Sequence, residues 1–267
     1  MSEYKNLAKS APGYGDGFIT KAISIAATLG MPVDWLLAII SWETGQFAAS
    51  GPPWTARNAK DNGGGIIGFT GVDGGGWEQM TPAQQLDLLI PYFGKWKKEY
   101  KIDSFRTPIE AYWIVTGPLG LLMGPEDDVG GGRTRQWIVD TMQGVFTRGG
   151  ITWTVPQVGI EGLWSVRIGS WLGCFVFLPS GDVWYATLPP QIIPGAPARA
   201  EHEFGYSERT YGHWVIADGN VRWRFGPRSD IRWFELSLPA PEQKWEGFVR
   251  PEGQGNFKMW RGSVEPI

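Results

Sequence analysis

Soft metal ligands are scarce in this sequence. Its 267 residues include one cysteine, Cys174, and two histidines, His202 and His213. One cysteine excludes an internal disulfide, and these three residues are too few for the usual structural zinc site. No spaced oxygen-ligand loop of the EF-hand type is present, so we expect no metal and no other cofactor. Cys174 lies in the apolar run 172–177, which favours a buried strand residue over a nucleophile.

An excess of charge of either sign is also missing. The chain carries 24 Lys and Arg against 27 Asp and Glu, a net charge of −3. Nucleic-acid-binding domains usually carry a clustered basic patch, and membrane-binding arms carry a polybasic run. Neither pattern occurs, so we expect no nucleic-acid partner.

No uninterrupted apolar run is long enough to predict a membrane-spanning helix. The most apolar stretch, residues 18–42, is interrupted by Lys21, Gly30, Pro32 and Asp34, which predicts two packed helices and no membrane span. Residues 1–17 contain no apolar segment of the secretory type. We therefore expect synthesis in the cytoplasm, and delivery by a non-classical route for any action in the periplasm or outside the cell.

The first half of the chain has helical periodicity. Asp16, Pro32, Pro82 and Pro108 stand where apolar-periodic segments begin, and proline at the first position of a helix loses no hydrogen bond. These signals predict helices near residues 16–29, 32–44, 82–98, 108–116 and 134–147. We expect an N-terminal tail over residues 1–16 and a mostly α-helical domain over residues 17–150.

After residue 150 the hydrophobic period changes to two. Short aromatic and β-branched runs are separated by turns that contain Gly181, Gly219 and Gly255, which predicts β-hairpins. These glycines recur at intervals of 38 and 36 residues, which suggests a hairpin repeat in a barrel or trefoil-like domain. The predicted fold class is therefore α+β, with an all-β domain over residues 151–267.

Glu43 is the strongest candidate for a chemical role. It ends the apolar helical stretch and shares a helix face with Leu36, Ile39 and Ile40. Loss of water and the negative end of the helix dipole are both expected to raise the pKa of this carboxyl group. An acid that stays protonated near pH 7 suits general acid catalysis of glycoside cleavage. The alternative is a glutamate that turns to solvent at a frayed helix end.

A glycine-rich segment follows at residues 58–71. Gly63-Gly64-Gly65 leads into Ile66-Ile67-Gly68-Phe69, which is typical of a tight hairpin where backbone approaches a ligand closely. No Gly-Lys-Ser/Thr sequence follows, so this segment is not a phosphate-binding loop.

Four motifs follow one another in the first half of the chain. The first two are Trp42-Glu43-Thr44-Gly45 and Gly65-Ile66-Ile67-Gly68-Phe69-Thr70. The third runs from Met80 through Gln85-Leu86-Asp87 to Tyr92-Phe93, and the fourth from Ala111-Tyr112-Trp113 to Pro118. In this order they resemble the lysozyme-like superfamily, and in particular phage and soluble-lytic-transglycosylase-type peptidoglycan hydrolases, in which an Ala-Tyr-Asn-Ala-Gly-Pro segment takes the place of the fourth motif. The resemblance covers roughly residues 17–148.

The resemblance implies cleavage of the β-1,4 bond between N-acetylmuramic acid and N-acetylglucosamine, with Glu43 as the general acid. Such a muramidase or lytic transglycosylase would act as a phage lysin, a virion enzyme or a secreted antibacterial effector. The residues that would contact the glycan strand are Gly65, Ile67, Phe69, Thr70, Tyr112 and Trp113, and the resemblance places Tyr112 beside Glu43. The sequence departs from the family pattern at two positions where a polar side chain is usual. Gly68 stands where the family usually has Gln, and Trp113 where it has Asn.

A second catalytic carboxylate is left open between Asp61 and Asp73. An inverting hydrolase needs it about 6.5–9.5 Å from the acid, and a retaining one about 5–5.5 Å. A lytic transglycosylase needs neither, because the muramyl 6-hydroxyl attacks. Both aspartates also suit turns beside glycine, without any catalytic role.

Two alternative functions remain open. Asp61 and Gly64 to Phe69 also resemble the family 46 chitosanases of the same superfamily. Chitosan is polycationic, so its hydrolases usually present an acidic cleft, whereas Arg57 and Lys60 make the charge of this region mixed. The helix with Gln85-Leu86-Asp87 fits the peptidoglycan hydrolases. The second alternative is an inactive lysozyme-like domain that binds a glycan or a partner.

Nine of the 16 tryptophans follow residue 150, and their role has three interpretations. Tryptophans at period-two spacing usually fill the core of a small β-domain. Indole faces also stack on sugars, which is consistent with a wall-binding accessory domain. Docking of this domain onto a delivery or inhibitor protein, such as an immunity protein, is the third.

Overall fold

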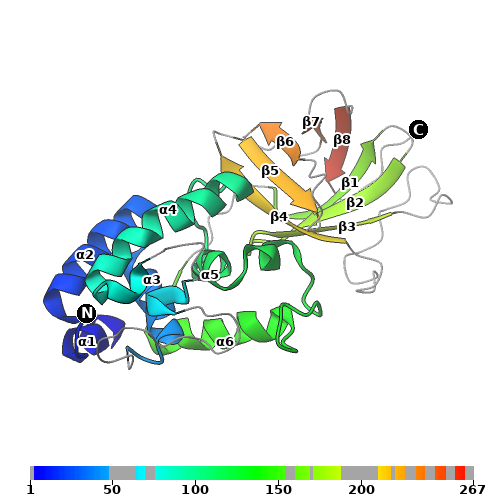
Figure 1. Cartoon of the computed structure of the whole chain (residues 1–267). Helices are drawn as coiled ribbons and strands as arrows, with labels where there is room; N and C mark the ends of the chain where they lie inside the picture. Colours follow the sequence, from blue (N-terminus) through cyan, green and yellow to red (C-terminus); the bar gives the residue numbers. More distant parts are fainter. Residues whose placement is uncertain are drawn as a thin grey trace. The chain divides into compact units, whose positions relative to one another are not determined.

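The computed structural model describes residues 3–47, 64–69, 76–153, 160–168, 171–187, 210–217, 220–225, 233–237, 244–250 and 256–261. The chain divides into two compact units (Figure 1). The first contains Met1–Pro118 and Trp137–Thr154, and the second Leu119–Gln136 and Val155–Ile267. Residues 119–136, which we expected in the helical domain, thus belong with the β-rich unit.

The six α-helices among the described residues include all five predicted ones. They are α1 (Glu3–Ser10), α2 (Gly15–Leu29), α3 (Val33–Glu43), α4 (Pro82–Tyr100), α5 (Pro108–Thr116) and α6 (Arg135–Arg148). Local signals explain the agreement. Thr81 forms a capping box with Gln84 at the start of α4, and Thr107 caps α5. Each is followed by proline in the first turn, and Gly30 ends α2 in the left-handed conformation.

Helix α1 lies in the segment expected to be a tail. Tyr4 and Ala8 are buried, and the Tyr4 hydroxyl donates a hydrogen bond of 2.6 Å to the carbonyl oxygen of Val145 in α6. The Tyr4 ring also covers Gly149, where a Cβ atom would overlap it. These contacts hold α1 against α6.

None of the described helices is by itself long and apolar enough to cross a membrane. Helices α2 and α3 meet the length and composition criteria only as a pair, and this pair is bent by 113°.

The second unit contains a closed antiparallel barrel. Its strands are β1 (Gly162–Ile168), β2 (Trp171–Phe177), β3 (Asp182–Thr187), β4 (Thr210–Ala217), β5 (Asn220–Phe225), β6 (Trp233–Ser237), β7 (Lys244–Arg250) and β8 (Asn256–Arg261). Each strand pairs with the next, and β8 pairs with β1 to close the barrel. The predicted α+β class, the hairpins and the barrel are therefore confirmed.

The trefoil alternative is wrong. The strands follow one another around the barrel in simple chain order. The recurring glycines belong to the hairpins β2–β3, β4–β5 and β7–β8, but β1 and β6 lie outside these pairs. The spacing of 38 and 36 residues is therefore not a threefold structural repeat.

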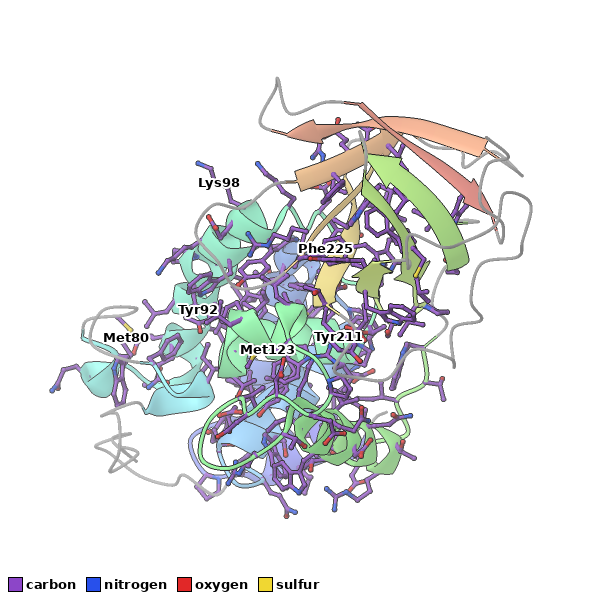
Figure 2. All side chains as sticks on the ribbon, turned by 90° about the vertical axis from the view of Figure 1, so that its right-hand side faces the viewer. Met80, Tyr92, Lys98, Met123, Tyr211 and Phe225 are labelled. Carbon is purple, nitrogen blue, oxygen red and sulfur yellow. The ribbon has the colours of Figure 1, made fainter. Side chains whose placement is uncertain are left out.

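Aromatic side chains fill the barrel. Trp214 and Trp223 are register partners across β4 and β5, and Trp223 stacks on Phe234 of β6 with ring centroids 5.3 Å apart. Figure 2 shows Phe225 among the side chains of this interior, and its ring lies 5.3 Å from that of Phe175. The core-packing interpretation is confirmed for Trp164, Trp214 and Trp223. Trp184 and Cys174 are buried as well.

Residues 119–136 belong to the β-rich unit because they contact its strands. Arg135 forms an ion pair with Asp182 of β3 and also donates to the Gly120 carbonyl oxygen. Gly124 lies against the ring of Tyr211 on β4, where a side chain would collide. Figure 2 shows Met123 and Tyr211 close to each other.

Candidate active site

Glu43 is the last residue of α3, and the backbone after it turns sharply. Gly45, Gln46 and Phe47 all have positive φ angles, of 60°, 65° and 59°. Two successive non-glycine residues in this region are uncommon, and such strain persists where surrounding contacts enforce it. Here the Thr44 hydroxyl accepts a hydrogen bond of 3.0 Å from the Phe47 N–H, and Phe47 is buried. These contacts fix the helix end that carries the carboxyl group.

The Glu43 side chain is only partly exposed, and its burial raises the pKa from 4.5 to about 7. A hydrogen bond from Tyr112 opposes this rise because it stabilises the charged form. Desolvation is the larger effect, so the direction predicted from the helix pattern is confirmed. At neutral pH the group is poised between its acid and base forms, which is what proton transfer in both directions requires.

Tyr112 lies in α5 and is buried. Its burial, followed by the neighbouring Glu43 carboxylate, raises the pKa of its hydroxyl above the ordinary value. The hydroxyl therefore stays protonated and donates to Glu43. Its oxygen accepts hydrogen bonds from Thr116, one turn further along the helix, and from the indole N–H of Trp42. Tyr112 is thus held from three sides in the position that contacts the carboxylate.

Helix α5 is itself fixed at its start. The side chain of Glu110 accepts hydrogen bonds from the backbone N–H and the guanidinium group of Arg106, at 2.6 and 3.1 Å. Both residues are buried, and their ion pair gives each buried charge an opposite one. At the other end, the Tyr92 hydroxyl donates to the Ile114 carbonyl oxygen at 3.0 Å. These contacts set the position of Tyr112.

The predicted hairpin is a turn of 3-10 helix, Gly65–Ile67, closed by one bridge between Gly64 and Phe69. Gln85 of α4 anchors it from the interior. Its side-chain oxygen accepts a hydrogen bond of 2.9 Å from the Ile66 N–H. Its amide donates to the carbonyl oxygens of Trp77 and Met80, at 3.1 and 3.3 Å. One buried amide therefore joins the turn, the following segment and α4.

Gly68 brings this turn beside Glu43. It has a φ angle of +73° and is exposed, and a Cβ atom at this position would lie 4.0 Å from Glu43 Oε2. A glutamine side chain here, as in the family pattern, would extend over the carboxyl group. With glycine, position 68 itself places no side chain over the acid.

The structure brings together only some of the predicted site residues. Glu43 and Tyr112 are in contact, and the turn that includes Gly65 lies beside them. The side chains of three predicted substrate-binding residues are buried in the core of the helical unit, namely Ile67, Phe69 and Trp113. Asp61, Thr70 and Asp73 lie outside the described residues, so the second carboxylate stays a prediction.

Three contributing residues were not predicted as members of the site. Thr116 follows Tyr112 by four residues, and this helical spacing would have placed both on one face. Trp42 precedes Glu43 and keeps 39% of its surface exposed. Gln85 forms contacts that are distant in sequence, and only the fold reveals them.

Among the described residues, no group of three or more His, Cys, Asp or Glu side chains could hold a metal ion. Comparisons with protein-family models, curated proteins and solved structures found no match. The lysozyme-like resemblance therefore stays a prediction from sequence motifs, and the chemistry of the site depends on its own geometry.

Proposed function

We propose that this chain is a peptidoglycan-degrading glycosidase that uses Glu43 as its general acid. The observation that carries the proposal is the environment of this one carboxyl group. Its burial raises the pKa to about 7, Tyr112 donates to it, and Gly68 beside it contributes no side chain. A protonated carboxyl group of this kind is needed to cleave a glycosidic bond at neutral pH.

In the proposed reaction, Glu43 donates its proton to the bridging oxygen as the bond between this oxygen and the muramyl C1 carbon breaks. The leaving sugar departs with a free hydroxyl group, and positive charge develops on the muramyl ring. The new Glu43 carboxylate is stabilised by the Tyr112 hydroxyl, because hydrogen bonds to a charged acceptor are stronger than neutral ones. Water or the muramyl 6-hydroxyl then adds to C1, and its proton returns to Glu43.

The helical unit alone supplies the proposed chemistry. Trp164, Trp214 and Trp223 do not support the interpretation of the second unit as a wall-binding domain, since these side chains fill the barrel. The proposal places the action of the enzyme at the cell wall, after delivery by a phage, a virion or a secretion system.

The test is release of soluble fragments from purified sacculi by the unchanged protein and by Glu43→Gln. This substitution keeps the size and hydrogen-bonding shape of the side chain but removes the acidic proton. We expect release by the unchanged protein only. Anhydromuramyl products would indicate a lytic transglycosylase, and reducing ends a muramidase.

Other outcomes would overturn the proposal. Equal release by both proteins would exclude Glu43 as the acid. Sugar release from chitosan but not from sacculi would favour the chitosanase alternative. Binding to sacculi without any release would favour the non-catalytic alternative.

A further inference from the structure

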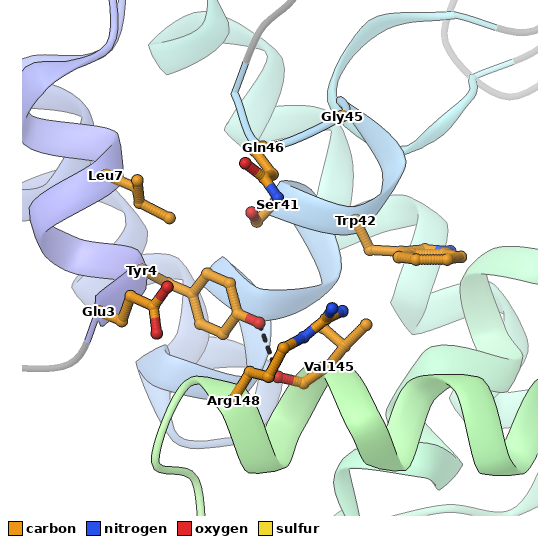
Figure 3. Close-up of a pocket in the computed structure, with 9 residues that line it drawn as sticks. All are labelled: Glu3, Tyr4, Leu7, Ser41, Trp42, Gly45, Gln46, Val145 and Arg148. Carbon is orange, nitrogen blue, oxygen red and sulfur yellow. Dashed lines mark hydrogen bonds between the residues drawn. The ribbon is translucent and has the colours of Figure 1, made fainter.

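A pocket of about 330 Å³ opens in the helical unit at the end of α3, the helix that carries the proposed acid. Figure 3 shows that its walls come from α1, from the end of α3 with the turn after it, and from α6. Its volume is at the lower end of the range for small-ligand sites, about 300–1,000 Å³. The mechanism proposed above makes no use of this pocket.

Two opposite charges border the pocket. Glu3 of α1 and Arg148 of α6 are exposed, and they lie on either side of the Tyr4 ring (Figure 3). Burial raises the pKa of Tyr4, while Arg148 lowers it and Glu3 raises it. Both charges are therefore within electrostatic reach of one hydroxyl group. A ligand with a carboxylate and an amino group would match this pair.

The other residues that line the pocket contribute apolar or amide groups, and hydrogen bonds hold two of them in place. Leu7 contributes partly exposed aliphatic surface, Gln46 contributes an exposed amide, and Val145 is buried behind them. The backbone N–H of Gln46 donates to the Ser41 carbonyl oxygen at 2.6 Å, which holds this residue in its left-handed conformation. Tyr4 is fixed by its hydrogen bond to Val145. The pocket is thus preformed, so little ordering cost opposes binding.

Trp42 joins the pocket to the proposed active site. Trp42 is one of the residues that line the pocket, and its indole N–H donates to Tyr112, which in turn donates to Glu43. Trp42 also precedes Glu43 in the chain. A ligand in the pocket that touches Trp42 is therefore separated from the acid by two side chains.

We propose that this pocket binds the short peptide carried by the muramic acid units of peptidoglycan. The inference rests on the proposed function, and it names the part of the substrate that selects this polymer over an unsubstituted glycan. Peptide carboxylates would pair with Arg148 and free amino groups with Glu3. Small aliphatic side chains of the peptide would contact Leu7. Chitin and chitosan carry no peptide and would gain nothing from the pocket.

The decisive experiment compares two substrates, sacculi and the same glycan strands stripped of peptide by an amidase. The measured quantity is the ratio of kcat/KM for peptide-bearing strands to that for stripped strands. We expect the unchanged protein to prefer peptide-bearing strands, and Arg148→Ala to reduce this preference by about two- to fivefold, because an exposed ion pair is lost. Lys98→Ala removes an exposed cation outside the pocket and should keep the full preference.

The outcomes separate the inference from the function that it rests on. If the unchanged protein cleaves both substrates equally well, or if Arg148→Ala retains the full preference, the peptide site is excluded while the glycosidase survives. If neither substrate is cleaved, the proposed function fails. The pocket is then tested by titrating Glu43→Gln with muramyl dipeptide and following the Trp42 indole resonance by NMR. A shift that disappears when Arg148 is also changed to Ala supports the site, and no shift at millimolar ligand overturns it.

Discussion

The hydroxyl group of Tyr112 donates a hydrogen bond to the carboxyl group of Glu43, although the two residues belong to different helices of the chain. Each residue changes the proton affinity of the other. The Glu43 carboxylate helps to raise the pKa of Tyr112, and the Tyr112 hydroxyl limits the rise in the pKa of Glu43 that burial causes. Tyr112 therefore stays a donor at neutral pH, while Glu43 changes its protonation state there.

The first prediction concerns the pH dependence of cleavage. The general acid must be protonated, and the pKa of Glu43 is about 7. We expect kcat/KM on soluble glycan strands to fall above pH 7, approaching about tenfold per pH unit. An alkaline limb centred near pH 4.5, the ordinary value for glutamate, would contradict the role of burial. The measurement is the initial rate between pH 4 and pH 9 at constant ionic strength.

Tyr112→Phe should move this alkaline limb to higher pH. The substitution removes the donor that stabilises the Glu43 carboxylate, so the pKa of Glu43 rises further. The maximal rate should also fall, because the carboxylate formed on proton transfer loses a charge-assisted hydrogen bond. Thr116→Val removes a donor to Tyr112 but leaves the contact with Glu43, and it serves as the control with a smaller shift. A lower rate with an unshifted limb would show that Tyr112 has only a structural role.

Glu43→Gln should stabilise the protein at alkaline pH. A group whose pKa is 4.5 when unfolded and about 7 when folded binds its proton more tightly in the native state. Stability is therefore lost as pH rises from about 4.5 to 7, and the variant avoids this loss. We expect the variant to gain about 1–3 kcal/mol at pH 8, and little at pH 4.5. Urea unfolding at both pH values measures the difference, with Glu99→Gln reporting the effect of removing an exposed carboxylate.

Helix positions were predictable because their signals are local. Pro82 and Pro108 mark the starts of α4 and α5, and the capping threonines precede them directly. Helix α1 was not predictable, since it is a short polar helix and isolated helices of this length are marginal in water. It is held by the contact of Tyr4 with Val145 and Gly149, and a pairing of residues so distant in sequence has no local signal.

In the site, too, features with a local sequence signal were predictable, and features that depend on tertiary contacts were not. The raised pKa of Glu43 followed from the apolar face of its own helix, whereas its contact with Tyr112 was expected only through the family resemblance. The anchoring of the turn by Gln85 depends on how α4 packs, so the sequence pattern did not reveal it. The pairing of Arg135 with Asp182, which places residues 119–136 with the barrel, is likewise non-local.

Gln85→Leu should destabilise the helical unit and loosen the turn beside Glu43. The Ile66 N–H and the Met80 carbonyl oxygen would lose their Gln85 partner, whereas the Trp77 carbonyl oxygen keeps the Met80 N–H. Each buried polar group left unsatisfied costs about 1–3 kcal/mol. We expect a total loss of about 2–4 kcal/mol, since water can reach part of the opened segment. Gln143→Ala, at an exposed position of α6, should change stability by less than about 0.5 kcal/mol. Equal effects of the two substitutions would show that the Gln85 contacts contribute nothing.

Gly65 and Gly68 form a matched pair that separates stability from access to the acid. Both have φ angles near +74°, so alanine at either position should cost about 1–2 kcal/mol in backbone strain. A Cβ atom at position 65 would also lie 2.6 Å from Gln85 Oε1 and 3.2 Å from the Trp77 ring. At position 68, the atom of the described residues that it would meet is Glu43 Oε2, at 4.0 Å.

Gly65→Ala should therefore be the less stable protein, while Gly68→Ala should show the larger loss of activity per folded molecule, because its methyl group stands beside the reacting carboxyl oxygen. Thermal unfolding and rates on sacculi, compared at a temperature where both variants are folded, measure the two effects. Equal specific activity of Gly68→Ala and the unchanged protein would show that substrate does not approach Glu43 from the side of this turn.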